Sequence, residues 1–185
     1  MSLKPDAGGY GSVTKTLHWV TFVAIRRQFV VGYAIDRADD LLEGVVDIWF
    51  GGEEEGLIVL HAVLGVTILA LTLIRLYWKL TKGLPAWAPS LTEGERRLAH
   101  RVEVTLYTVM ILMPLTGLAL LFLSGESWDL AGGEWEAPLD LVDHDLLLPA
   151  HIVTHIVFFV ALATHVGLVL KHQLVNRDRL LSRML

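Results

Sequence analysis

The chain has 185 residues, of which 54% are hydrophobic and only 19% are charged, and its mean hydropathy of +0.53 is too high for a typical soluble domain. The formal net charge is −5, and the two signs are concentrated in different loops. The chain contains no cysteine, which excludes disulfides, iron–sulfur clusters, thiol catalysis and covalent attachment of haem through a CxxCH motif.

Four apolar windows approach or exceed the length of about 20 residues that crosses a bilayer as a helix. They cover about residues 17–35, 57–78, 104–123 and 146–170, and Arg26, Arg27 and Gln28 interrupt the first. No secretory signal pattern precedes them, because residues 1–15 have no apolar core. The sequence therefore predicts an all-α membrane protein: residues 1–185 form one domain, a four-transmembrane-helix bundle with both termini on one side.

Two shorter patterns lie between the windows. The stretch ADDLLEGVVDIWF (38–50) spaces its apolar residues as a short helix lying on the membrane surface would. The stretch SLTE (90–93) predicts a capping box from Ser90 to Glu93, which starts the third helix well before its apolar window. Pro114 is expected to kink that third helix.

Basic residues are concentrated on one side of the predicted bundle. Apart from Arg26, Arg27 and Arg37, every Lys and Arg lies in or near the N-terminal tail, the loop between the second and third windows, or the C-terminal tail. Cytoplasmic loops carry such an excess of Lys and Arg. Both termini are therefore expected to be cytoplasmic.

Acidic residues dominate the two opposite loops, which are predicted to face outward. They are Asp36, Asp39, Asp40, Glu43, Asp47, Glu53, Glu54 and Glu55 in the first loop, and Glu126, Asp129, Glu134, Glu136, Asp140, Asp143 and Asp145 in the second. Two interpretations stay open: a solvated surface, or a docking surface for a cationic redox protein.

Four histidines lie in or beside the fourth window, and two of them share a face. His151 and His165 are fourteen residues apart, which leaves them about 40° short of four full helical turns and ~21 Å apart along the axis. That separation covers most of the ~30 Å hydrocarbon core. It suits two haems, one near each membrane surface.

Each haem needs a second axial ligand at matching depth. His61 opens the second window on the outer side and matches His151, whereas His18 opens the first window on the inner side and matches His165. Isolated interfacial histidines are usually hydrogen-bonded side chains, but polar groups inside a membrane are rare without a role. Zinc is the competing metal, but it would require His, Cys or carboxylate ligands clustered at one depth, whereas these two pairs lie at two depths.

The remaining polar residues of the windows give weaker hypotheses. His155 lies 80° from His165 around the helix and is interpreted as a neighbour of a haem or its propionates. His172 and His100 lie at the inner surface, where they either line a quinone site or are simply interfacial. Arg26 could pair with a haem propionate, and Arg27 has no such role.

These features together resemble the bacterial four-helix cytochrome b561 family. The resemblance rests on LHW (17–19), LHAVLGVTILALTLIRLYW (60–78), AHRVEVTLYTVMILMPLTG (99–117), and His151 with LATHVGLVLKHQLVNRDRLLSRML (162–185). It implies that His18, His61, His151 and His165 are the axial iron ligands of two haems b, in a multi-pass protein of the bacterial inner membrane. It also implies electron exchange with quinone. Some members oxidise superoxide, and related cytochromes are membrane subunits of hydrogenases and formate dehydrogenases.

The function expected first is a quinone-linked di-haem oxidoreductase, with superoxide as one candidate donor. The acidic outer loops would repel that anion and favour a cationic redox protein. Two alternatives remain: a haem-bearing anchor that relays electrons for a larger redox complex, and a metal transporter with histidines along a pore. Membrane lipid is the expected surrounding partner, and no nucleic acid is expected to bind.

Overall fold

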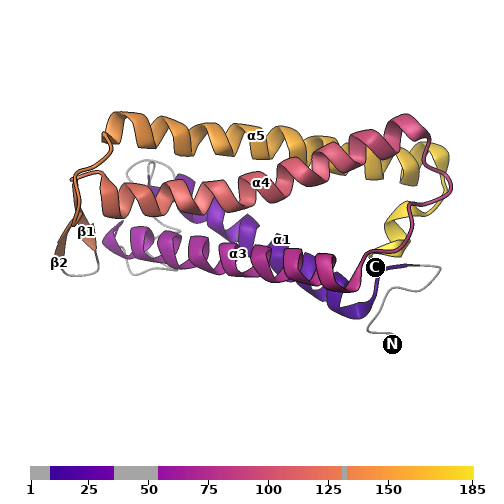
Figure 1. Ribbon diagram of the computed structural model, residues 1–185, viewed down its shortest axis with the longest axis horizontal. Coiled ribbons are helices and arrows are strands. Elements are labelled where there is room, and N and C mark those ends of the chain that lie inside the picture. The colour runs from indigo at the N-terminus through magenta and orange to yellow at the C-terminus, as the bar shows by residue number, and fades with distance from the viewer. Residues whose placement is uncertain (1–8, 36–53, 131–132) are drawn as a thin grey trace.

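Four long helices run along a common direction in the computed structural model (Figure 1), which describes residues 9–35, 54–130 and 133–185. They are α1 (Ser12–Ile35), α3 (Glu54–Lys82), α4 (Glu93–Leu123) and α5 (His144–Leu170). Each contains one of the four predicted apolar windows. The helix predicted within residues 38–50 lies outside the described residues.

Among the described residues, α3, α4 and α5 are long and apolar enough to cross a membrane, with α5 continuing to Asn176 in that span. α1 does not reach the same hydropathy, because Arg26, Arg27 and Gln28 interrupt its apolar sequence. All four helices nevertheless lie in one bundle, in which α1 packs against α3, α3 against α4, and α4 against α5.

The predicted capping box of α4 lies two residues too early in the sequence. Thr92, not Ser90, is the N-cap: its hydroxyl accepts a hydrogen bond from the Glu95 amide, and its own amide donates to a Glu95 carboxylate oxygen at 2.8 Å. SLTEGE contains two overlapping matches to the pattern. The later one is used because the Leu91 amide bonds to the Ala88 carbonyl and so closes a turn over Ser90 before the helix begins.

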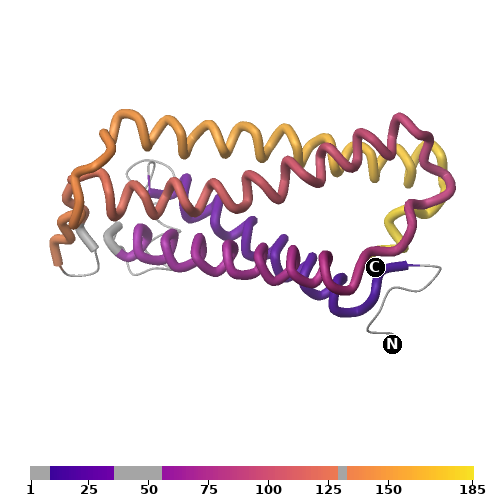
Figure 2. Tube along the Cα trace, in the orientation of Figure 1, coloured from indigo at the N-terminus to yellow at the C-terminus, as the bar shows by residue number. Residues whose placement is uncertain are grey.

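The two ends of the bundle are built differently. At one end, here called the hairpin end, β1 (Ser127–Leu130) and β2 (Gly133–Glu136) form an antiparallel hairpin in which Trp128 pairs with Trp135. At the other, here called the tail end, the chain leaves α5 through a π-helical turn, η1 (Lys171–Asn176), and a 3-10 turn, η2 (Leu180–Arg183). Figure 2 shows the start of α1 and the C-terminal residues together at the tail end.

The C-terminal residues fold back beneath the helices. The Trp19 indole donates to the Met184 carbonyl at 3.0 Å, and Lys15 Nζ donates to the Leu185 carbonyl at 2.7 Å. Arg183 donates to the carbonyl of Ala86, which precedes α4, at 2.7 Å. These bonds tie the tail to both α1 and the loop between α3 and α4.

Side chains on α5 point outward as much as inward. Val153, Ile156 and Val160 are all more than half exposed, which is the behaviour of a helix with apolar residues on all sides that lies in lipid. The interior is correspondingly small. Its buried cluster at the centre contains Val109, Met110 and Phe158, and two cavities lie on either side of that cluster.

Candidate functional site

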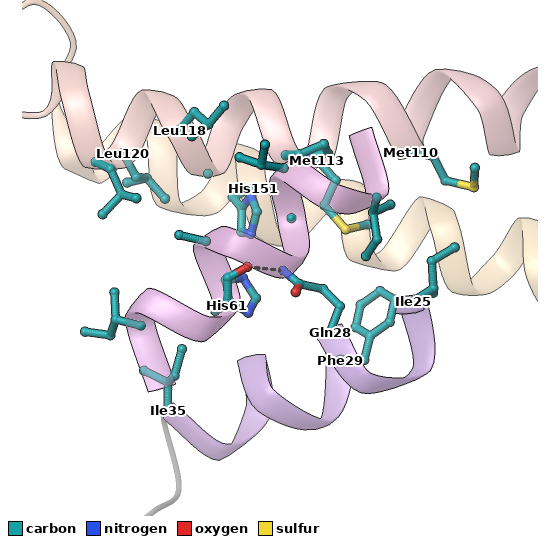
Figure 3. A pocket seen from close by; sticks show the side chains of 18 of the residues that line it. Ile25, Gln28, Phe29, Ile35, His61, Met110, Met113, Leu118, Leu120 and His151 are labelled. Carbon is teal, nitrogen blue, oxygen red and sulfur yellow. Dashed lines mark hydrogen bonds between the residues drawn. The ribbon is translucent and has the colours of Figure 1, made fainter. Parts of the chain in front are cut away.

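The structure brings the four predicted histidines together as two separate pairs. His61 of α3 and His151 of α5 face each other at the hairpin end, with ring centroids 6.3 Å apart. His18 of α1 and His165 of α5 face each other at the tail end, with ring centroids 6.4 Å apart. In Figure 3 the His61 and His151 rings point toward one another from their different helices.

Both separations fit one metal ion between two imidazoles. A metal–nitrogen bond to imidazole is about 2 Å long, and the ring nitrogen lies about 1 Å from the ring centre, so two trans ligands have centroids about 6 Å apart. A direct imidazole contact would bring the rings closer than this. Neither pair belongs to a cluster of three or more metal-ligating side chains within the described residues. Two imidazoles match in number the two axial positions of a haem iron.

Each pair lines its own cavity. The hairpin-end cavity has a volume of about 200 Å³ and an almost wholly apolar lining around His61 and His151. The tail-end cavity, around His18 and His165, has a volume of about 830 Å³. Ile25, Phe29, Met110 and Phe158 line both cavities, so these four side chains form the wall between them.

Glycines make room for the rings at the hairpin end. A Cβ on Gly32 would lie 2.7 Å from His61 Cε1, and a Cβ on Gly117 would lie 3.2 Å from His151 Cε1. A side chain on Gly32 would clash with the His61 ring, and one on Gly117 would require the His151 ring to shift by a few tenths of an ångström. Gly32 carries no local sequence signal that would identify it as a contact of the His61 ring.

Gln28, one of the polar residues that interrupt the first apolar window, joins α1 to α3. Its side-chain amide donates to the His61 carbonyl at 3.0 Å, and it is buried between α1 and α3 (Figure 3). The bond ties the backbone of α3 to α1 at the residue that contributes a paired histidine. A polar residue inside an apolar helix is therefore retained here by a hydrogen bond.

Buried donors without a protein partner lie beside both cavities. Trp128 Nε1 at the hairpin-end cavity and Trp78 Nε1 at the tail-end cavity are buried and form no hydrogen bond among the described residues. An unpaired buried donor costs about 1–3 kcal/mol, so each indole suits an acceptor brought by a bound group. Haem propionates are such acceptors, and the residues present therefore fit haem. Neither indole was singled out from the sequence.

The tail-end cavity is lined by cations. Arg26, Arg75 and Lys79 all border it; Lys79 pairs with Glu103 at 2.9 Å, and Arg75 Nη2 lies 3.4 Å from His18 Nδ1. Arg26 thus borders the tail-end cavity, and its contact with a haem propionate stays a prediction. Arg27 borders neither cavity, and both arginines are exposed on α1.

The structure separates the two histidines predicted at the inner surface. His100 borders the tail-end cavity and is largely exposed. His172 is fully buried outside the cavity lining: its Nδ1 donates to Asp178 at 2.5 Å, and its Nε2 lies 3.4 Å from a Glu95 oxygen. The hydrogen bond from His172 holds the pKa of Asp178 below its ordinary value. His172 therefore links the turn after α5 to the start of α4.

His155 packs beside the hairpin-end pair without lining its cavity. Its ring centroid lies 4.7 Å from that of His151 and 5.3 Å from that of Phe29. This agrees with its interpretation as a neighbour of the site.

The chain is similar over nearly its whole length to known cytochromes. The sequence model of the family described as prokaryotic cytochrome b561 matches residues 9–185. Cytochrome b562 of Cereibacter sphaeroides is 28% identical over 177 residues, which cover 96% of this chain and 95% of that protein. Cytochrome b561 homolog 1 of Escherichia coli is 25% identical over 91% of this chain and 92% of its own length. A probable superoxide oxidase, CybB of Yersinia pestis, is 28% identical over 69% of this chain and 73% of its own length.

Proposed function

Because the chain belongs to the prokaryotic cytochrome b561 family and is a membrane electron-transfer protein, we propose that it binds two haems b and transfers electrons between them across the bilayer. The observation that carries this proposal is the pair of facing imidazoles in each of two cavities, at 6.3 and 6.4 Å. His61 and His151 are the proposed ligands at the hairpin end, and His18 and His165 at the tail end.

The protein's own contribution is ligation, orientation and exclusion of water. Haem iron, when bound, supplies the one-electron redox chemistry. His151 and His165 lie fourteen residues, or ~21 Å, apart along α5, so the two histidine pairs would hold the haems at depths separated by most of the thickness of a bilayer core. Ile25, Phe29, Met110 and Phe158 keep the region between the two cavities apolar, and Arg26 and Arg75 offer positive charge to propionates at the tail end.

The proposed location is the bacterial inner membrane, with all four helices crossing it and both termini in the cytoplasm. The family and the three apolar helices support a bacterial membrane protein. The orientation is supported by charge, since Lys79, Lys82 and Lys171 lie at the tail end, whereas Glu134 and Glu136 lie on the hairpin. An excess of Lys on the cytoplasmic side is the usual bias.

Quinone is the proposed electron partner at the tail end. Reduction of a quinone needs proton donors, and His100 borders a cavity of about 830 Å³ while remaining exposed. His172 contributes at most indirectly, because its ring nitrogens face Asp178 and Glu95.

A cationic redox protein is the proposed electron donor at the hairpin end. Glu126, Glu134 and Glu136 are exposed there, and their field attracts a basic protein and repels an anion. Superoxide remains the competing donor on the strength of the resemblance to the Yersinia pestis protein.

A second candidate, a haem-bearing anchor subunit of a larger redox complex, is favoured by one observation. Arg27 is exposed in the middle of α1 and borders neither cavity, and an ionisable group at such a position is costly unless another group pairs with it. A partner helix that covers this face would supply such a group.

Electron exchange with quinol in nanodiscs tests the first candidate against the second. Anaerobic addition of a short-chain quinol to the isolated, oxidised protein should reduce both haems, measured as growth of the sharp α band. A control reduced with dithionite gives full amplitude. Haems that dithionite reduces and quinol does not would contradict quinone exchange by the isolated chain, and a stoichiometric partner on purification would then favour the anchor.

A further inference from the structure

The two imidazoles at the hairpin end are held differently. His151 Nδ1 lies 2.8 Å from the hydroxyl oxygen of Thr116 on α4. His61 Nδ1 is buried and has no hydrogen-bond partner among the described residues. At the tail end, the neighbour of His18 Nδ1 is Arg75 Nη2, a group that donates and cannot accept. The bond to Thr116 thus distinguishes His151 from His61 and His18.

The Met113 carbonyl oxygen determines which of His151 and Thr116 donates in their hydrogen bond. Thr116 Oγ1 also lies 2.9 Å from the Met113 carbonyl oxygen, which can only accept a hydrogen bond. A hydroxyl has a single hydrogen, so Thr116 donates to Met113 and accepts from the Nδ1–H of His151. This arrangement selects the tautomer with hydrogen on Nδ1. It leaves the lone pair on Nε2 free to bind iron.

The surrounding segment of α4 is shaped around the same ring. Pro114 is buried within the helix, Thr116 follows it by two residues, and Gly117 lies against His151 with no room for a relaxed Cβ. Residues 114–117 of α4 therefore supply both Gly117, against which the His151 ring packs, and the Thr116 hydroxyl, which accepts from Nδ1 and so fixes the tautomer.

We infer that Thr116 is a positioning residue for the hairpin-end haem, which orients His151 as a ligand and lowers the midpoint potential of that haem. This role rests on the proposed function. A hydrogen bond from the far nitrogen of a ligating histidine raises the basicity of the ligand. A more basic ligand stabilises the ferric form over the ferrous form, and so favours passage of the electron toward the other haem.

Thr154 provides a matched control. It is a buried threonine on α5 that also bonds to His151. Its hydroxyl, however, donates to the backbone carbonyl of His151 at 2.6 Å and forms no hydrogen bond with the imidazole ring. Replacing its hydroxyl removes a comparable bond without changing the acceptor at Nδ1.

The test compares T116V, T116S and T154V by potentiometric titration of the two haems in nanodiscs, followed at the α band. In T116V one midpoint should move to a more positive value and the other should stay, and affinity for the hairpin-end haem should fall about 10–100-fold. T116S should restore the wild-type midpoints, because serine keeps the hydroxyl. T154V should leave both midpoints unchanged.

Unchanged midpoints and haem affinity in T116V would overturn the role of Thr116. An equal shift in T154V would overturn it too, because the effect would then come from general loosening around His151. A wild-type protein with fewer than two haems is a different failure: it would contradict the proposed function itself.

Discussion

The rings of His61 and His151 each lie against a glycine of a neighbouring helix, and Gly32 makes the tighter contact. Its replacement by alanine puts a methyl group 2.7 Å from His61 Cε1, which forces the ring out of line with His151. Within a helix, Gly→Ala alone stabilises by about 1 kcal/mol. G32A should therefore lose the hairpin-end haem although the helix itself is favoured.

The control for G32A is G167A on α5, where a new Cβ would have no neighbour within 4 Å. Haem content and the optical spectrum of the purified variants give the answer. G167A should keep both haems. Full haem content in G32A would contradict the placement of His61 against α1.

The pairing of the histidines could be predicted from the sequence because it depends on helix geometry and depth alone. His151 and His165 share one helix, and their partners lie in the first third of α1 and α3, at matching levels. Gly32, Thr116 and Trp128 could not be predicted as site residues. Each acts on a ring or cavity formed by other elements, and no local pattern reports such a contact.

At the scale of the elements, the turn after α5 is held by the buried His172. The ring bonds to Asp178 at one side and approaches Glu95 of α4 at the other, and the intervening chain takes left-handed backbone conformations at Arg177 and Arg179 (φ 55° and 59°). This cluster keeps the C-terminal tail folded beneath the tail-end cavity, which Met184 borders.

Loss of that cluster should release the tail. A hydrogen bond to a charged group contributes about 1.5–3 kcal/mol, so H172A should raise the population of the open tail roughly tenfold or more. Trypsin cleavage at Arg177 and Arg179 in nanodiscs should accelerate accordingly. Q173A, which alters an exposed side chain of the same turn, is the control, and equal cleavage rates in the two variants would contradict the assignment.

The same bond sets a pH dependence. The pKa of Asp178 is lowered in the folded protein by its bond with His172, so its stabilising contribution is present above the ordinary aspartate pKa of about 3.9. That contribution is lost as the pH falls through the lower folded value. The tail of the wild-type protein should therefore remain protected from protease at neutral pH.

Apolar windows predicted all four helices, and the signal is strongest for α3, α4 and α5, whose apolar runs are long enough to span a bilayer. The ends of α3 were predicted less well, since that helix extends through polar residues beyond its apolar window. The capping-box pattern, in contrast, placed the start of α4 within two residues of its observed N-cap. The hairpin of four-residue strands was missed, because such short and exposed strands carry little periodicity. The π-helical turn at η1 has no recognised sequence pattern.

For the whole molecule, the separation of charge predicts how an electron donor approaches. Screening shortens from about 30 Å at 0.01 M salt to about 8 Å at 0.15 M, so haem reduction by a basic cytochrome should slow steeply as salt rises. The combined variant E126Q/E134Q/E136Q should slow it at low salt and flatten the salt dependence. Reduction of the haems by superoxide, an anion, should instead become faster as salt rises and faster in the triple variant.

The control neutralises basic residues at the tail end, with K82Q and R97Q, and should leave the salt dependence of the basic cytochrome unchanged. Stopped-flow reduction at low and high salt provides the rates. Salt-independent reduction by both donors, in wild type and hairpin variant alike, would leave the acidic hairpin as a solvated surface.

The most direct measurement is haem content per chain by the pyridine haemochrome assay, for fully loaded wild type and for alanine variants of the paired histidines. We expect two haems b in the wild type. H61A and H151A should each retain only the tail-end haem, and H18A and H165A only the hairpin-end haem. H155A should retain both. A wild-type content of one haem, or a haem lost in H155A and kept in H151A, would contradict the assignment of two facing pairs.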